Sequence, residues 1–172
     1  MNPIHPSLAP LARTAKTFAR EIITSGHVLD LATPLRDAVG KDRGWLRPEH
    51  RVGDPARYMR HIVYVDPEDA FVITAITWLP GQHSPVHGHY VWCAYGVAEG
   101  ELTEELFRTP GEMIEPFATK VMRAGELAEL DLGGPLYHRV SNRSQAPVVT
   151  LHVYGVAASS LTTGINRIYG EA

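Results

Sequence analysis

The chain has 172 residues, of which 44% are hydrophobic and 20% are charged, a balance typical of one folded domain and not of a disordered chain. Its 16 basic and 19 acidic residues leave a net charge of −3, so the chain lacks the basic field that binding of nucleic acid requires. No apolar run approaches the roughly 20 residues that cross a bilayer, no signal-peptide segment opens the chain, and the single cysteine excludes an internal disulfide, so we expect a cytoplasmic protein without membrane contact.

Residues 7–52 have a helical pattern. Apolar residues recur there at helical spacing, namely Leu8, Leu11, Ala12, Ala15, Phe18, Ala19, Ile22 and Ile23. A second helix is predicted to start with Thr33 as N-cap and Pro34 in the first helical position, and to end near Gly40. Residues 45–54 are predicted to form a polar connector.

From residue 58 onward the pattern changes to short strands between turn residues. The predicted strands are 58–65, 71–79, 86–98, 101–108, 117–123, 126–132, 136–142 and 147–154. Eight short strands favour a mainly β fold, a sandwich or a jelly-roll barrel of the class that includes cupins. We expect one domain over residues 1–172, with a helical cap at 1–54, a β-barrel at 55–155 and a C-terminal segment at 156–172.

Histidine is the residue type that points to chemistry, since the chain has nine of them. His87 and His89 lie two apart on a predicted strand, so both imidazoles face the same side. A third donor must come from another segment, and His138 on the predicted strand 136–142 is the best candidate. Such a pair alone is more often a surface pair or buried in a core, but three neutral imidazoles with open positions are what catalytic Zn²⁺ or non-haem Fe(II) needs.

Five segments occur in a specific order and spacing: Tyr58-Met-Arg60, Trp78-Leu-Pro-Gly-x5-His87-Gly-His89, Gly100-Glu-Leu-Thr-Glu-Glu-Leu-Phe107, His138-Arg-Val-Ser-Asn142 and Thr150-Leu-His152-Val-Tyr154. Together they resemble the cysteine dioxygenase family of thiol dioxygenases. These proteins are cupins with three metal-binding histidines that oxidise small thiols to sulfinic acids. The resemblance covers about residues 57–155.

The resemblance implies a cupin double-stranded β-helix and a metal centre in which His87, His89 and His138 hold Fe(II). It also implies that Arg60 binds the carboxylate of a small thiol substrate, with support from Tyr58. Dioxygen is the implied second substrate.

The same resemblance implies a relay in which Thr150 orients His152 and His152 orients Tyr154, whose hydroxyl lies beside the reacting groups. Cys93 stands where the usual cupin pattern has a metal-binding glutamate. It also matches the cysteine that forms a thioether with the relay tyrosine in mammalian members. The alternative for Cys93 is a small buried hydrophobic side chain.

Departures from the family pattern leave the substrate open. Gly88 stands where the family usually has aspartate between the histidines, and the turn after Tyr154 is closer to bacterial mercaptopropionate dioxygenases. Those bacterial enzymes typically have glutamine in place of Arg60, glycine in place of Cys93, and a carboxylate-binding arginine in the C-terminal segment, where this chain has Arg167. Cysteine is the first candidate substrate, and 3-mercaptopropionate is an alternative. Mercaptosuccinate is a further candidate if Arg60 and Arg167 both reach the pocket.

Two functions of other kinds compete with thiol oxidation. A three-histidine site could hold Zn²⁺ and activate water, although Arg60 and the Thr150-His152-Tyr154 segment would then have no necessary role. The chain could also be a non-catalytic metal-binding cupin, either a small-molecule sensor or a structural oligomer.

Overall fold

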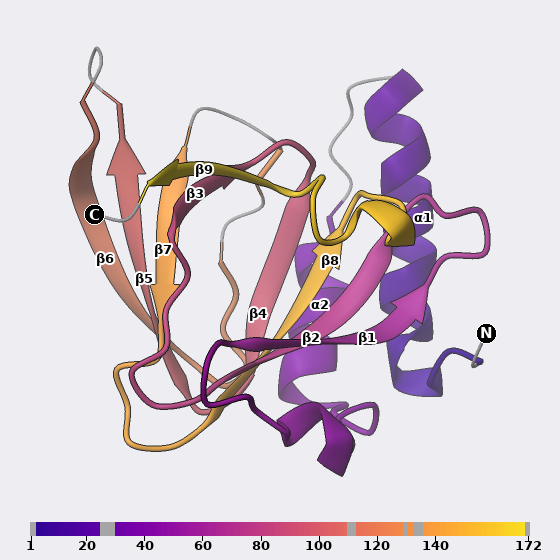
Figure 1. The fold of residues 1–172 in the computed structure, drawn as a ribbon. Helices are drawn as coiled ribbons and strands as arrows, with labels where there is room; N and C mark the ends of the chain where they lie inside the picture. The colour runs from indigo at the N-terminus through magenta and orange to yellow at the C-terminus, as the bar shows by residue number, and fades with distance from the viewer. Residues whose placement is uncertain (1–2, 25–29, 110–112, 129–130, 133–135, 171–172) are drawn as a thin grey trace.

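The computed structural model describes residues 3–24, 30–109, 113–128, 131–132 and 136–170, and within them two antiparallel sheets face each other (Figure 1). The first sheet has the order β1-β2-β8-β4, formed by Met59–Val65, Val72–Trp78, Val148–Tyr154 and Cys93–Glu99. The second has the order β6-β5-β7-β3-β9, formed by Glu115–Arg123, Glu101–Arg108, Tyr137–Ser141, Val86–His89 and Asn166–Gly170.

Strand β8 is buried along its whole length because both of its faces are covered. Successive side chains of a strand point to opposite faces. Val149, Leu151 and Val153 pack into the hydrophobic cluster that also holds the N-terminal helices. The alternate residues Thr150 and His152 are equally buried but face the space between the sheets. The apolar residues of β8 therefore hold the strand, and its polar residues line the interior.

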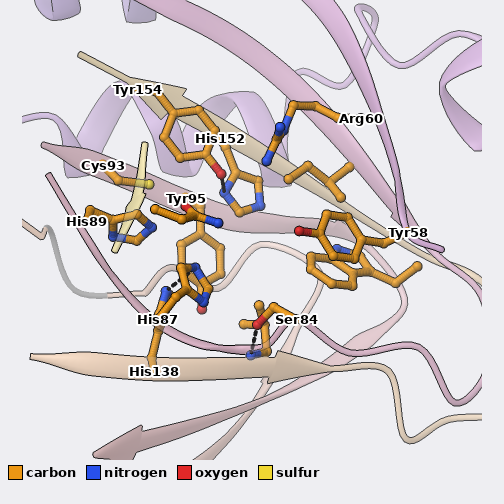
Figure 2. A pocket seen from close by; sticks show the side chains of 14 residues that line it. Tyr58, Arg60, Ser84, His87, His89, Cys93, Tyr95, His138, His152 and Tyr154 are labelled. Atoms are coloured by element: carbon orange, nitrogen blue, oxygen red, sulfur yellow. Dashed lines mark hydrogen bonds between the residues drawn. The ribbon is translucent and has the colours of Figure 1, made fainter. Parts of the chain in front are cut away.

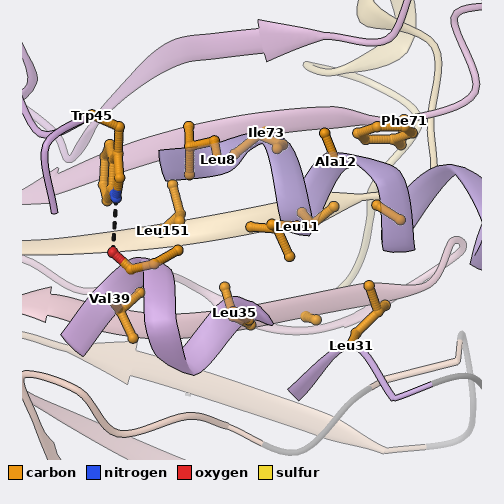
Figure 3. Close-up of a cluster of buried hydrophobic side chains, with 14 of the residues drawn as sticks. Leu8, Leu11, Ala12, Leu31, Leu35, Val39, Trp45, Phe71, Ile73 and Leu151 are labelled. Atoms are coloured by element: carbon orange, nitrogen blue, oxygen red, sulfur yellow. Dashed lines mark hydrogen bonds between the residues drawn. The ribbon is translucent and has the colours of Figure 1, made fainter. Parts of the chain in front are cut away.

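Two helices, α1 (Ala9–Thr24) and α2 (Ala32–Gly40), cover the outer face of the first sheet (Figures 1 and 3). Their buried residues follow helical spacing, as predicted: Leu11, Ala12, Ala15, Phe18 and Ala19 on α1, and Leu35, Ala38 and Val39 on α2. The predicted mainly β fold with N-terminal helices packed on it is confirmed. Within the described residues, neither helix has the length and apolar character that a bilayer span requires.

The structure corrects the start of the second helix. Thr33 lies inside α2, and the capping group is the carboxylate of Asp30, which accepts hydrogen bonds from the backbone N–H of Ala32 at 2.8 Å and from the Thr33 hydroxyl at 2.7 Å. A carboxylate is the stronger acceptor at the positive end of a helix, so Asp30 takes the role expected of Thr33.

The connector 45–54 is less polar than predicted. Trp45 is 1% exposed, and its Nε1–H donates to the carbonyl of Ala38 at 2.8 Å, which joins the connector to α2 (Figure 3). A short 3₁₀ helix follows at Pro48–Arg51. The buried indole makes this segment part of the core and not a solvated linker.

The described strands differ from the predicted ones in three places. The strand expected over 86–98 is two strands, β3 and β4, which belong to different sheets. Of the strand expected over 126–132, residues 129–130 lie outside the described residues, and Leu127 and Asp131 make only isolated bridges to β4. The C-terminal segment, in which no strand was predicted, supplies β9, which pairs with β3.

A tight turn at Gly100 joins β4 to β5. Its φ of +84° lies in the left-handed region, which glycine adopts without strain. A Cβ at this position would also approach the Pro147 carbonyl oxygen to 3.1 Å. The turn therefore requires glycine both for its conformation and for its close packing.

We predict that Phe18→Ala lowers the free energy of unfolding by about 3–5 kcal/mol, because it removes a large side chain from a closed core. Phe18 is fully buried and meets the ring of Trp92 edge-on, with centroids 4.9 Å apart. Urea denaturation measures the change. Phe117→Ala is the matched control, since Phe117 is 47% exposed, and its effect should stay within about 0.5 kcal/mol. Equal effects of the two substitutions would contradict the packing of α1 on the sheet.

Candidate active site

Strand pairing brings three histidines together between the sheets. His87 and His89 lie on β3 with one residue between them, so they share a face. His138 lies directly opposite His87 on the neighbouring strand β7, and cross-strand neighbours point to the same side. One ring nitrogen from each of the three lies within 4.8 Å of the others. These are the three residues that the sequence indicated.

Each histidine has its Nδ1 fixed by a neighbour. The Nδ1 of His87 lies 2.9 Å from the Pro85 carbonyl, that of His89 lies 2.8 Å from the Asp131 carboxylate, and that of His138 lies 2.8 Å from the Glu104 carboxylate. A carbonyl can only accept, and ionised carboxylates do the same, so all three Nδ1 atoms donate. In the neutral form of each ring, this tautomer places the lone pair on Nε2.

The Nε2 atoms of His87 and His138 lie 3.2 Å apart. Two lone pairs at this distance repel each other, and a cation between them removes that repulsion. Burial lowers the pKa of His87 well below its usual value, with the neighbouring His138 and His89 acting in the same direction, so His87 stays neutral. Buried neutral imidazoles with fixed tautomers are the donors that a transition-metal ion takes, so these residues fit a metal.

The donor set distinguishes among metals. Among the described residues, the only such group of three or more possible ligands consists of these histidines, without Cys93 and without a carboxylate. Three imidazoles with open positions suit a catalytic ion of the Zn²⁺ or Fe(II) kind. The carboxylates of Asp131 and Glu104 stand behind the rings and do not join the group.

Glu104 connects His138 to the rest of the interior. Its carboxylate also accepts a hydrogen bond from the Tyr95 hydroxyl at 2.7 Å. Burial alone would raise the pKa of Glu104, but the hydrogen bonds from His138 and Tyr95 outweigh it and keep the pKa below its usual value. The ring of Tyr95 in turn stacks on His152, with centroids 4.7 Å apart and planes 7° apart. Glu104 therefore stays ionised and links the metal group to β8.

The relay residues form one hydrogen-bonded chain along β8. The His152 Nε2 lies 2.8 Å from the Thr150 hydroxyl, and the Tyr154 hydroxyl lies 3.0 Å from the His152 Nδ1. The chain extends to Trp78, whose Nε1–H donates to the Thr150 hydroxyl at 3.0 Å. Burial lowers the pKa of His152 and raises that of Tyr154, so both are neutral near pH 7.

Arg60 places a positive charge on the side of the cavity opposite the histidines (Figure 2). Its guanidinium lies 5.8 Å from the centre of the Tyr154 ring, and one nitrogen donates to the Leu161 carbonyl at 3.3 Å. The buried Nε of Arg60 has no partner among the described residues. Tyr58 lies on the same side of the view as Arg60 in Figure 2 and packs on Trp78, with ring centroids 4.5 Å apart. The cavity thus has a cationic wall facing the histidines.

Cys93 lies opposite Tyr154 in the pairing of β4 with β8. It is 2% exposed and lines the same cavity as the histidines. Burial raises the pKa of its thiol well above the usual value, so Cys93 is a neutral thiol. This position is compatible with both interpretations of Cys93, a buried hydrophobic side chain and a partner of Tyr154.

Arg167 is not among the residues that line the cavity. It lies on β9, and its guanidinium sits over the ring of Tyr137, 4.7 Å from the centroid, on the other face of the sheet. The residue of β9 that does line the cavity is its neighbour Asn166. Strand alternation puts one of these two neighbours inside and the other outside.

Several residues of this site were missed from the sequence. Glu104 occupies an inward position of a predicted strand, and a carboxylate there was a usable signal, because buried carboxylates need partners. Asp131 and Asn166 gave no such signal, since the predicted strand 126–132 had no assigned neighbour and Asn166 lay outside every predicted strand. Tyr95 was hidden because its role depends on the pairing of β4 with β8.

Comparisons with known proteins agree with this geometry. A family model described as cysteine dioxygenase type I matches residues 7–162. The solved structure of TT1209 from Thermus thermophilus superposes with a TM-score of 0.50 at 23% identity, over 63% of this chain and 91% of that chain. Peruvianin-I, described as a cysteine peptidase from Thevetia peruviana latex, gives a TM-score of 0.51 at 13% identity, over 73% of this chain and 81% of that chain.

At these identities the two solved structures show likeness of fold alone. The family match carries more, because it spans most of the chain, and the range that it covers contains the cavity-lining residues from Arg60 to Tyr154. The chain belongs to the cysteine dioxygenase type I family.

Proposed function

We propose that this protein is an Fe(II)-dependent thiol dioxygenase that oxidises a small thiol carboxylate to its sulfinic acid, with cysteine as the first candidate. The reaction is RSH + O₂ → RSO₂H, so both oxygen atoms end on sulfur and no further reductant is consumed. The observation that carries the proposal is one cavity lined by the three-histidine group, by Arg60 and by the His152–Tyr154 pair.

Each part of the cavity has a task in this reaction. Fe(II), when bound by the three histidines, would supply the redox chemistry that lets dioxygen react with a thiol. Arg60 binds the substrate carboxylate, for which its planar fork is suited. Tyr154 holds its hydroxyl in place through His152 and stays protonated, because burial raises its pKa. We place this activity in the cytoplasm, where thiols such as Cys93 stay reduced.

The charges of the cavity favour a substrate with one carboxylate. Among the described residues that line the cavity, Arg60 provides the guanidinium, while Arg167 lies on the opposite face of the sheet. A second carboxylate, as in mercaptosuccinate, would enter without an arginine to neutralise it and would lose solvation. Cysteine and 3-mercaptopropionate are therefore the better candidates.

The proposal is tested by oxygen uptake of the Fe(II)-loaded protein with a panel of thiols, with products weighed by mass spectrometry. We expect cysteine to gain two oxygen atoms for each O₂ consumed. Cysteamine, which lacks the carboxylate, should show a kcat/KM about 10- to 100-fold lower, because the charged hydrogen bond to Arg60 is lost. Stoichiometric iron without oxidation of any thiol would contradict the proposal and direct attention to the zinc form or to a binding role.

The metal group has its own test in His138→Ala. We expect the wild-type protein to bind about one Fe(II) per chain, and the variant to bind it at least about 100-fold more weakly, because two imidazoles replace three. Metal analysis after dialysis measures this. His83→Ala is the control, since His83 lies outside the group and contacts the Ser84 carbonyl. A His138→Ala protein that keeps its iron and its activity would show that another residue is the third ligand.

The pairing of Cys93 with Tyr154 predicts a thioether after turnover. The Cys93 sulfur would bond to the ring carbon beside the Tyr154 hydroxyl, one hydrogen would leave each partner, and O₂ would accept the two electrons. Intact mass after turnover with iron and thiol should therefore be two hydrogens lighter than the sequence requires. Cys93→Ser should show no such change, and a wild-type mass without the shift after repeated turnover would exclude the crosslink.

A further inference from the structure

Strand β9 places an unassigned polar residue beside the metal group. Asn166 lies directly opposite His89 in the pairing of β3 with β9. Residues opposite each other in an antiparallel pair have Cβ atoms about 4.5–5.5 Å apart and point to the same face. Since His89 faces the cavity, Asn166 faces it as well, and it is one of the residues that line it.

Strand β9 is held firmly enough to fix this position. The Tyr90 N–H donates to the Ile165 carbonyl at 2.8 Å, and the side chain of Ile165 is 2% exposed. On the outer face, the Arg167 guanidinium reaches across β3 to the ring of Tyr137. It passes over Gly88, where a Cβ would lie 3.0 Å from a guanidinium nitrogen and 2.7 Å from the Leu136 carbonyl oxygen.

The glycine between the metal-binding histidines therefore has a structural consequence. Gly88 gives Arg167 the room to cross β3, and Arg167 in this position holds β9 against β3. Alternation along β9 then directs Asn166 inward. Arg167, which the sequence suggested as a second carboxylate-binding residue, instead helps to hold the strand that carries Asn166.

The other polar side chains on the metal side of the cavity are already engaged. The Ser84 hydroxyl donates to the Pro85 carbonyl and accepts from the Val140 N–H, at 2.9 and 3.1 Å. Tyr95 is bonded to Glu104, and Tyr154 is bonded to His152. Tyr58 stands on the side of Arg60 (Figure 2).

Among the described residues, no hydrogen bond joins the Asn166 amide to another group. This leaves Asn166 as the side chain with a spare acceptor oxygen beside the histidines. The N–H groups of a substrate amine can donate to such an acceptor, whereas the Arg60 guanidinium offers only donors and the histidine Nε2 lone pairs face the metal position.

We propose that Asn166 contacts the substrate and selects thiol carboxylates that carry an amine, its side-chain oxygen accepting a hydrogen bond from that amine. This inference rests on the proposed function. The carboxylate binds Arg60 at one end of the cavity, the thiol lies at the histidines, and the amine points to β9. Asn166 is then the residue that distinguishes cysteine from 3-mercaptopropionate, which has the same thiol and carboxylate but no amine.

The test compares wild-type protein, Asn166→Ala and Asn166→Asp with both thiols. We expect Asn166→Ala to lower kcat/KM for cysteine about 10- to 100-fold and to change that for 3-mercaptopropionate less than about threefold. Asn166→Asp keeps an acceptor oxygen and should retain the preference for cysteine. Anaerobic calorimetry with the Fe(II)-loaded protein should show the same pattern in Kd, and it measures binding independently of turnover.

The control is Tyr169→Phe, a substitution on the same strand that keeps the ring against Tyr137, at a position that is 42% exposed and does not line the cavity. It should leave kcat/KM unchanged for both thiols. Equal losses for both thiols in Asn166→Ala, or the same selective loss in Tyr169→Phe, would overturn the inference. If no thiol is oxidised, the proposed function fails, but the calorimetric comparison of the two thiols still decides the role of Asn166.

Discussion

The alternation of strand β8 is the constraint on which the rest of the structure depends. Its apolar residues Val149, Leu151 and Val153 are covered by α1 and α2, and this burial fixes the register of the strand. The same register turns Thr150 and His152 inward. A shift by one residue would exchange the two sets, so the free energy that holds the helices on the sheet also keeps the hydrogen-bonded chain to Tyr154 in place.

The metal group is prepared by the groups behind it. The acceptors Pro85, Asp131 and Glu104 come from three separate segments, and each directs one Nε2 lone pair inward. Glu104 also holds Tyr95, whose ring stacks on His152. The two halves of the site, one on each sheet, are thus joined by a buried carboxylate and an aromatic stack.

The C-terminal segment contributes to the wall of the cavity. The Leu161 carbonyl binds the Arg60 guanidinium, Ile165 packs into the cluster with Cys93, and β9 adds Asn166 beside His89. The two substrate contacts that we propose therefore come from the first and the last strand, Arg60 on β1 and Asn166 on β9. In this proposal the histidines fix where the thiol reacts, and these two flanking residues select the thiol.

The sequence by itself predicted the mainly β fold and the His87–His89 pair from local spacing, and its resemblance to a family pattern added His138 and the Thr150-His152-Tyr154 segment. The interval between His87 and His89, and the alternation from Thr150 to Tyr154, survive any error in strand boundaries. Only the tertiary structure decided which residue of the C-terminal segment enters the cavity, and it chose Asn166 over Arg167. The local sequence pattern could not decide this, because the face to which each residue of β9 points depends on the register of β9 with β3. The contacts of Glu104 with His138 and of Asp131 with His89 likewise form only when distant segments come together.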